Sequence, residues 1–86
     1  MPVVIQRNDL PPEVRERVAK EIVSAIGEQK GIWLLDMTSE PQANAWDIEV
    51  FGPNKFNWAR RFSGADRDSD VISEAVRSAV ADQAAA

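Results

Sequence analysis

Residues 46–62 read WDIEVFGPNKFNWARRF and hold two of the three tryptophans, all three phenylalanines and three of the ten basic residues of the chain. On both sides of the Gly-Pro-Asn sequence at residues 52–54, apolar side chains alternate with other residue types. Such alternation on both sides of a turn sequence is typical of two antiparallel strands joined by a short connection. The stretch therefore predicts a β-hairpin.

The turn and the alternation favour different registers of this hairpin. A two-residue turn at Pro53 and Asn54 would pair Phe51 with Phe56, and it would mix charged with apolar side chains on one face. The alternation favours a register with one strongly apolar face, in which Val50 pairs with Phe56, Ile48 with Trp58, and Trp46 with Arg60. Because a one-residue slip moves every side chain to the other face, we expect the second register, with a three-residue loop or a bulge at residues 52–54.

In that register the aromatic and basic side chains of the hairpin separate in space. Phe56, Trp58 and Phe62 would point into a core beneath the helices, where they could not stack on nucleic-acid bases. Lys55 and Arg61 would instead face acidic residues across the ribbon, on its other side.

The segments that flank the hairpin predict two helices and one more strand. Residues 8–31 favour an amphipathic helix, with apolar residues at every fourth position, prolines suited to its first turn and Gly31 suited to its end. Residues 32–37 favour a strand, residues 38–44 a polar loop, and residues 63–86 a second amphipathic helix. We expect one α+β domain over residues 1–86, a two-layer sandwich in which two helices cover one face of a three-stranded antiparallel sheet. The order is α-β-β-β-α, with an additional strand possible at residues 3–5.

This order of elements resembles that of the double-stranded-RNA-binding domain, in which two helices pack on one face of a three-stranded antiparallel sheet. In that family the second helix begins with a run of lysines that contact phosphates. The corresponding stretch here is DRDSDV, residues 66–71, which is acidic where the family is basic.

The composition provides few groups for catalysis or metal binding. The chain has no Cys, His or Tyr, so the commonest general base and the usual zinc ligands are missing. Asp66, Asp68 and Asp70 have the spacing of the first three calcium-loop ligands, but Val71 and Arg77 stand where such a loop needs Gly and Glu. We expect these aspartates to mark the N-terminus of a helix. We also expect no enzymatic activity, no cofactor and no metal.

Charge supports only a secondary hypothesis of nucleic-acid binding. The formal net charge is −4, which opposes binding to a polyanion. Residues 52–67, however, carry four basic residues against one acidic residue, and the candidate contacts with nucleic acid are Lys55, Arg60, Arg61 and Arg67.

The predicted first strand suggests an interaction surface, because it is apolar on both sides. Helices on one face of the sheet would leave Ile32 and Leu34 beside Phe51 on the other face, and exposed apolar patches often mark contact sites. The cover could be residues 3–5, a second copy of the chain or another protein. We therefore expect a cytoplasmic, non-membrane protein that acts as a protein–protein interaction or homodimerisation module. The sequence leaves open whether residues 3–5 pair within the chain or with a neighbour.

Overall fold

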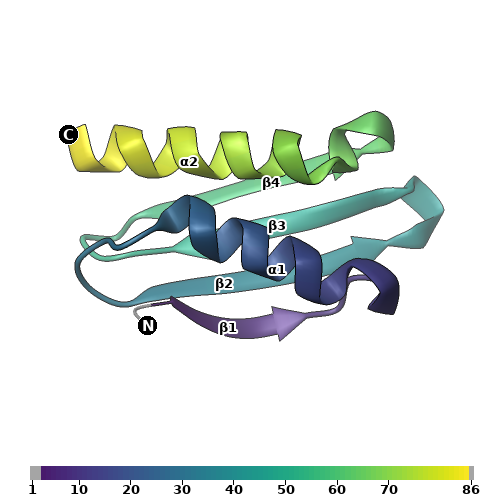
Figure 1. Cartoon of the computed structure of the whole chain (residues 1–86), viewed down its shortest axis with the longest axis horizontal. Coiled ribbons are helices and arrows are strands. Elements are labelled where there is room, and N and C mark those ends of the chain that lie inside the picture. Colours follow the sequence, from purple (N-terminus) through teal and green to yellow (C-terminus); the bar gives the residue numbers. More distant parts are fainter. Residues whose placement is uncertain (1–2, 86) are drawn as a thin grey trace.

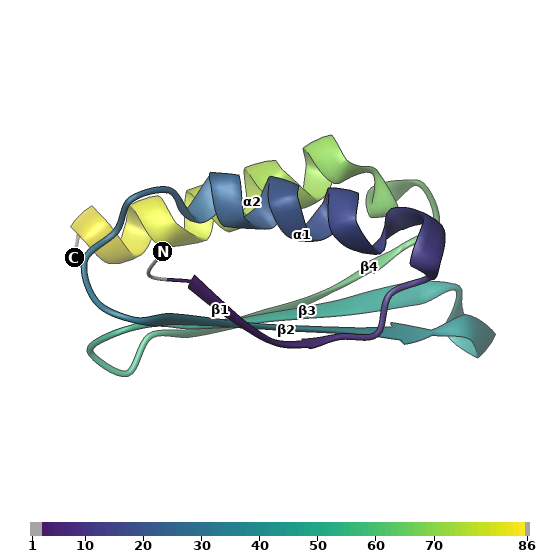
Figure 2. The ribbon, with the colours of Figure 1, turned by 60° about the horizontal axis from the view of Figure 1, so that its bottom comes forward.

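The computed structural model describes the backbone of residues 3–85 and the side chains of residues 3–82, arranged in two layers. The strands are β1 (Val3–Asn8), β2 (Trp33–Glu40), β3 (Ala45–Phe51) and β4 (Asn57–Ser63), and the helices are α1 (Pro12–Ile26) and α2 (Ser69–Ala85). Figure 1 shows the order of these elements, and Figure 2 shows both helices on one side of the sheet with the other side open. The predicted two-layer α+β sandwich is confirmed.

The sheet has four strands and is mixed. Its order is β1-β2-β3-β4, and β1 runs parallel to β2 of the same chain, with Val3 beside Trp33. The additional N-terminal strand therefore exists and pairs within the chain, so the expectation of a purely antiparallel three-stranded sheet is corrected. The physical reason is α1, which carries the chain back across the sheet so that β2 enters in the same direction as β1.

The hairpin has the predicted faces but a different register. Val50 lies opposite Trp58, and Trp46 lies opposite Phe62, so the pairing is displaced by two residues from the predicted one. A two-residue displacement keeps every side chain on its predicted face, and it places Phe62 rather than a charged residue opposite Trp46. The connection is also longer than predicted. It spans residues 52–56, and the Gly52 N–H donates a hydrogen bond to the Phe56 carbonyl at its base.

Close packing against Trp33 explains the residue types at two positions of this connection, Gly52 and Phe56. An added Cβ at Gly52 would lie 2.7 Å from the nearest atom of the Trp33 ring, so only glycine leaves room for the indole there. The ring of Phe56 also packs against Trp33, with ring centroids 5.4 Å apart. Phe56 therefore contributes to the core from the loop, not from a strand as expected.

The ends of the helices follow from local backbone geometry. α1 ends at Ile26 rather than near Gly31, because Gly27 adopts a φ of 71° and its N–H donates to the Val23 carbonyl. α2 begins after Asp68, whose Oδ1 accepts a 2.8 Å hydrogen bond from the Asp70 N–H. An aspartate of the acidic stretch thus caps a helix, as predicted.

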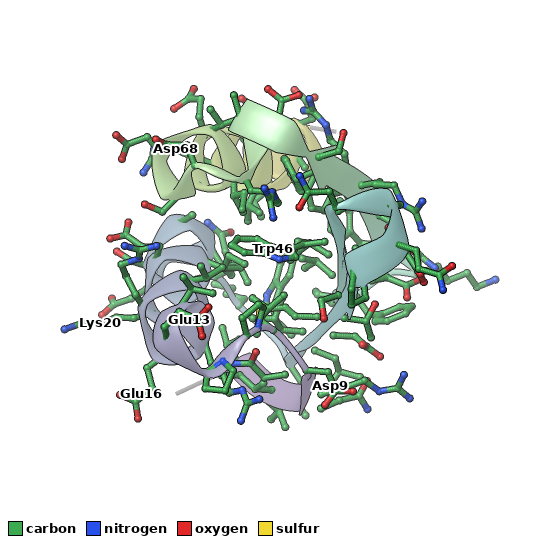
Figure 3. All side chains as sticks on the ribbon, turned by 90° about the vertical axis from the view of Figure 1, so that its right-hand side faces the viewer. Asp9, Glu13, Glu16, Lys20, Trp46 and Asp68 are labelled. Carbon is green, nitrogen blue, oxygen red and sulfur yellow. The ribbon has the colours of Figure 1, made fainter. Side chains whose placement is uncertain are left out.

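The core lies between the two layers. Figure 3 looks along the strands and shows Trp46 in the interior, between the sheet and the helices. The cluster combines buried residues of β2, β3 and β4, one apolar stripe of each helix and Leu10 from the loop before α1. Its largest fully buried side chains include Trp33, Phe62, Leu10, Ile22 and Ile26. Because both helices pack on this face of the sheet, the opposite face has no helical cover.

Candidate interaction surface

The candidate site is the uncovered face of the sheet. Side chains alternate along a strand, so the residues next to the buried positions of each strand point to this face. On β2 these are Leu34, Asp36 and Thr38, which are half-buried, while their neighbours Trp33, Leu35 and Met37 are buried. The face is therefore built by the same alternation that builds the core.

One end of this face is apolar. Val4, Leu34 and Phe51 form a row across three strands, since Leu34 is the register partner of both Val4 and Phe51. Ile32 lies two residues before Leu34 and is 70% exposed, the most exposed of the large apolar side chains described. We call these four residues, Val4, Ile32, Leu34 and Phe51, the apolar row.

The structure brings the predicted interface residues together and adds one. Leu34 and Phe51 are direct cross-strand partners, and Ile32 adjoins them along the chain. Val4 was missed, because residues 3–5 were considered only as a cover for this face. As an edge strand, β1 instead extends the face sideways and leaves Val4 50% exposed. The signal that could have identified it is that residues 3–5 are all apolar, so a strand there would place Val4 on the face opposite to that of Val3 and Ile5.

The rest of the face carries charges of both signs. The Arg61 Nε donates to Asp47 Oδ1 at 2.8 Å, and a second guanidinium nitrogen donates to Oδ2 at 3.0 Å. Arg7 lies 3.9 Å from Asp36. Asp36 is the register partner of Glu49, and like charges directly opposite each other on a sheet are unfavourable. The ion pairs among the described residues include none that neutralises Glu49.

The ion pair across β3 and β4 shifts the protonation of its partners. Hydrogen bonding from Arg61 lowers the pKa of the Asp47 carboxyl below its usual value, partial burial opposes this shift, and the charge of Arg61 adds to it. The same hydrogen bond raises the pKa of Arg61. Both groups are therefore firmly ionised near neutral pH and held by each other.

The structure does not gather the four candidate nucleic-acid contacts on one face. Arg61 points to the open face and Arg60, its neighbour on β4, to the helix side. Lys55 lies in the connection between β3 and β4, and Arg67 lies beyond the other end of β4, in the 3-10 helix Gly64–Arg67. The Arg67 guanidinium lies over the Trp46 ring, 5.7 Å from its centroid.

The described part of the chain shows neither a metal-holding cluster nor a membrane-spanning helix. Within it, no group of three or more carboxylates is arranged to hold a metal ion. None of the helices described has the length and apolar character needed to cross a membrane.

Comparison with protein-family models, with curated proteins and with solved structures finds no match to this chain.

Proposed function

We propose that this protein is a non-enzymatic interaction module that forms a homodimer by packing its open sheet face against the same face of a second copy. The observation that carries the proposal is the apolar row, in which Leu34 and Phe51 are cross-strand partners on a sheet face without helical cover and Ile32, two residues before Leu34, is 70% exposed. Exposed apolar patches on a small soluble domain commonly mark contact sites.

The charges of the face favour a second copy as the occupant. The face carries Arg7 and Arg61 together with three carboxylates, of which Glu49 lies opposite Asp36. A copy related by a two-fold axis presents the same set, so an arginine of one copy can neutralise Glu49 of the other. A two-fold interface is self-complementary in this way.

The face is large enough for a small dimer interface. The molecule measures 35 × 20 × 20 Å between Cα atoms, so its broad face covers about 700 Å². Stable complexes bury about 800 Å² on each partner. The proposed interface therefore lies at the lower end of that size class.

Sedimentation equilibrium over a wide range of concentrations tests this proposal. The unmodified chain should shift from monomer towards dimer as concentration rises. Ile32→Asp is the sharpest variant, because Ile32 precedes β2 and is largely exposed, so its replacement spares the core. Leu34→Asp should also abolish association, and its fold is checked separately by urea unfolding because Leu34 is half-buried.

Ser24→Asp provides the matched control, since it adds the same charge at an exposed position of α1. It should dimerise like the unmodified chain. A chain that remains monomeric at millimolar concentration, or an Ile32→Asp variant that associates as strongly as the control, would refute the proposal. If Leu34→Asp unfolds a monomer, Leu34 belongs to the core rather than to an interface.

A further inference from the structure

A second surface lies between β4 and α2, on the other side of the sheet. It is an open groove of about 720 Å³, with Trp58 and Arg60 on the β4 wall and a long stretch of α2 on the other wall. Figure 1 shows α2 running beside β4, at the far side of the molecule from β1. This groove is separate from the apolar row.

The groove borders a free strand edge. β4 is the last strand of the sheet and pairs only with β3 among the strands described. The N–H and C=O groups on its outer edge are therefore open to another strand, and an extended peptide can bind by adding to such an edge. Alternate side chains of an added strand would point to the helix side, into the groove beside α2.

The α2 wall combines an apolar row with an acidic row. Val71, Ala75 and Ala79 follow one another at intervals of four residues, so they lie along one line of the helix, and two of the three are small. Asp70, Glu74 and Asp82 lie on the adjacent line, also at multiples of four residues. The wall thus offers room for apolar side chains and carboxylates for basic ones.

The charges of the groove favour a cationic ligand. Three carboxylates face one guanidinium, that of Arg60, which lies over the Phe62 ring at 5.0 Å from its centroid. Glu74 is paired with Arg77 at 2.8 Å, whereas Asp70 and Asp82 take part in none of the ion pairs of the described chain. Asp82 also stands in the C-terminal part of α2, where a negative charge opposes the helix dipole. At this position the negative charge of Asp82 is unfavourable for the helix, and a basic side chain of a ligand would neutralise it.

We propose that this groove binds an extended basic peptide segment, which adds to β4 as a fifth strand and directs lysine or arginine side chains to the acidic row of α2. The three helix-side positions of β4 are Trp58, Arg60 and Phe62. An apolar side chain of the peptide lies opposite Arg60. Basic side chains lie opposite Trp58 and Phe62, away from the positive charge of Arg60.

A second copy of the chain fits this edge less well. Pairing of β4 with another β4 would bring Arg60 and Arg61 of both copies into one seam, and charged residues on edge strands disfavour such self-pairing. A separate peptide avoids this repulsion, because its sequence places no charge opposite Arg60.

The test uses the full chain and a fluorescein-labelled heptapeptide, Thr-Lys-Thr-Val-Thr-Lys-Thr, whose length equals that of β4 and whose sequence reads the same in both directions. We expect saturable binding by fluorescence anisotropy. A peptide with Glu in place of both Lys residues should bind at least about tenfold more weakly, since it faces like charges. A peptide N-methylated along the edge that faces β4 should not bind, because it cannot form the ladder of hydrogen bonds.

Variants of the acidic row locate the site. Asp82→Asn and Glu74→Gln should each weaken binding of the Lys peptide by about two- to fivefold, the effect of one exposed ion pair. Glu21→Gln is the matched control, since it removes one carboxylate from an exposed position of α1, outside the groove. It should leave the affinity unchanged.

Five results would overturn the proposal, four of them from the peptide and variant measurements. These four are absence of binding up to millimolar peptide, equal binding of the Lys and Glu peptides, binding that survives N-methylation, and equal effects of Asp82→Asn and Glu21→Gln. Self-association that survives Ile32→Asp and is competed away by the Lys peptide would assign the groove to a second copy instead, and would also refute the proposal.

Discussion

Arg61 and Asp47 are joined by two parallel hydrogen bonds of 2.8 and 3.0 Å across the open face of the β3–β4 hairpin. The pair fixes the outer side of the same hairpin whose inner side carries Trp46 and Phe62. One strand pair therefore holds a charged outer face and an apolar inner face in a single register.

This ion pair predicts a pH dependence of stability. The pKa of Asp47 is lower in the folded chain than its usual value, so its contribution to stability is present above the unfolded pKa of about 4 and is lost as the pH falls through the folded pKa. Asp47→Asn should lower the urea midpoint slightly at pH 7, and the difference should disappear at an acidic pH below the folded pKa. Both partners are about half exposed, so the effect is small. An Asp47→Asn variant that is equally destabilised at both pH values would contradict this assignment.

Gly52 is predicted to be intolerant of a side chain. Gly52→Ala should lower the free energy of unfolding by about 1–3 kcal/mol, because the new Cβ would lie 2.7 Å from the Trp33 ring and the buried ring must move. Urea unfolding measures the loss. The matched background is Trp33→Phe, which shortens the ring, and there the cost of Gly52→Ala should be clearly smaller. Equal costs in the two backgrounds would show that the contact is not its cause.

Asp68 is predicted to stabilise α2 by capping it. Asp68→Ala should lower the free energy of unfolding by about 0.5–2 kcal/mol, whereas Asp68→Asn or Asp68→Ser should retain most of the stability, because both can accept the Asp70 N–H. Figure 3 shows Asp68 at the end of α2. Thermal unfolding followed by circular dichroism gives the comparison, and Asp66→Ala serves as the control for loss of charge. A loss for Asp66→Ala as large as that for Asp68→Ala would mean that charge, rather than the cap, matters.

Nucleic-acid binding stays an untested alternative with a clear signature. Four phosphate contacts would give a log-log dependence of affinity on salt with a slope of roughly −3 to −4. Because Arg60 and Arg61 point to opposite faces and Arg61 is held by Asp47, we expect little binding of duplex RNA at low salt and a shallower slope. Fluorescence anisotropy with labelled duplex RNA measures both quantities. Tight binding with a slope near −4, abolished by Arg61→Ala, would favour the alternative.

Much of the fold could be predicted because the spacing of apolar residues along the sequence indicates which side chains are buried. The alternation of Trp46, Ile48 and Val50 and the helical spacing of Ile72, Val76 and Val80 correctly assigned the buried faces of β3 and α2. The exact hairpin register could not be predicted in this way, because a displacement by two residues leaves every face unchanged. What decides it is the packing of Phe56 and Gly52 around Trp33, which joins segments far apart in the chain.

The candidate surface was predicted only in part, because its strand faces follow from the sequence pattern and the placement of its segments does not. Leu34 and Phe51 follow from strands that are apolar on both sides, and the structure makes them direct neighbours. Val4 and the parallel pairing of β1 depend on the path of the chain through α1, which a short apolar segment does not specify. The groove beside α2 was not anticipated, because it depends on where α2 lies relative to the free edge of β4.

The proposed face-to-face dimer is tested most directly by isotope-filtered NOE spectroscopy on an equal mixture of ¹³C-labelled and unlabelled chains, at a concentration where the dimer is populated. We expect intermolecular contacts from the methyl groups of Ile32 and Leu34 to side chains of the same sheet face in the other copy. Intermolecular contacts confined to α1, α2 or β4, or the absence of any contact in a sample whose measured mass is that of a monomer, would contradict it.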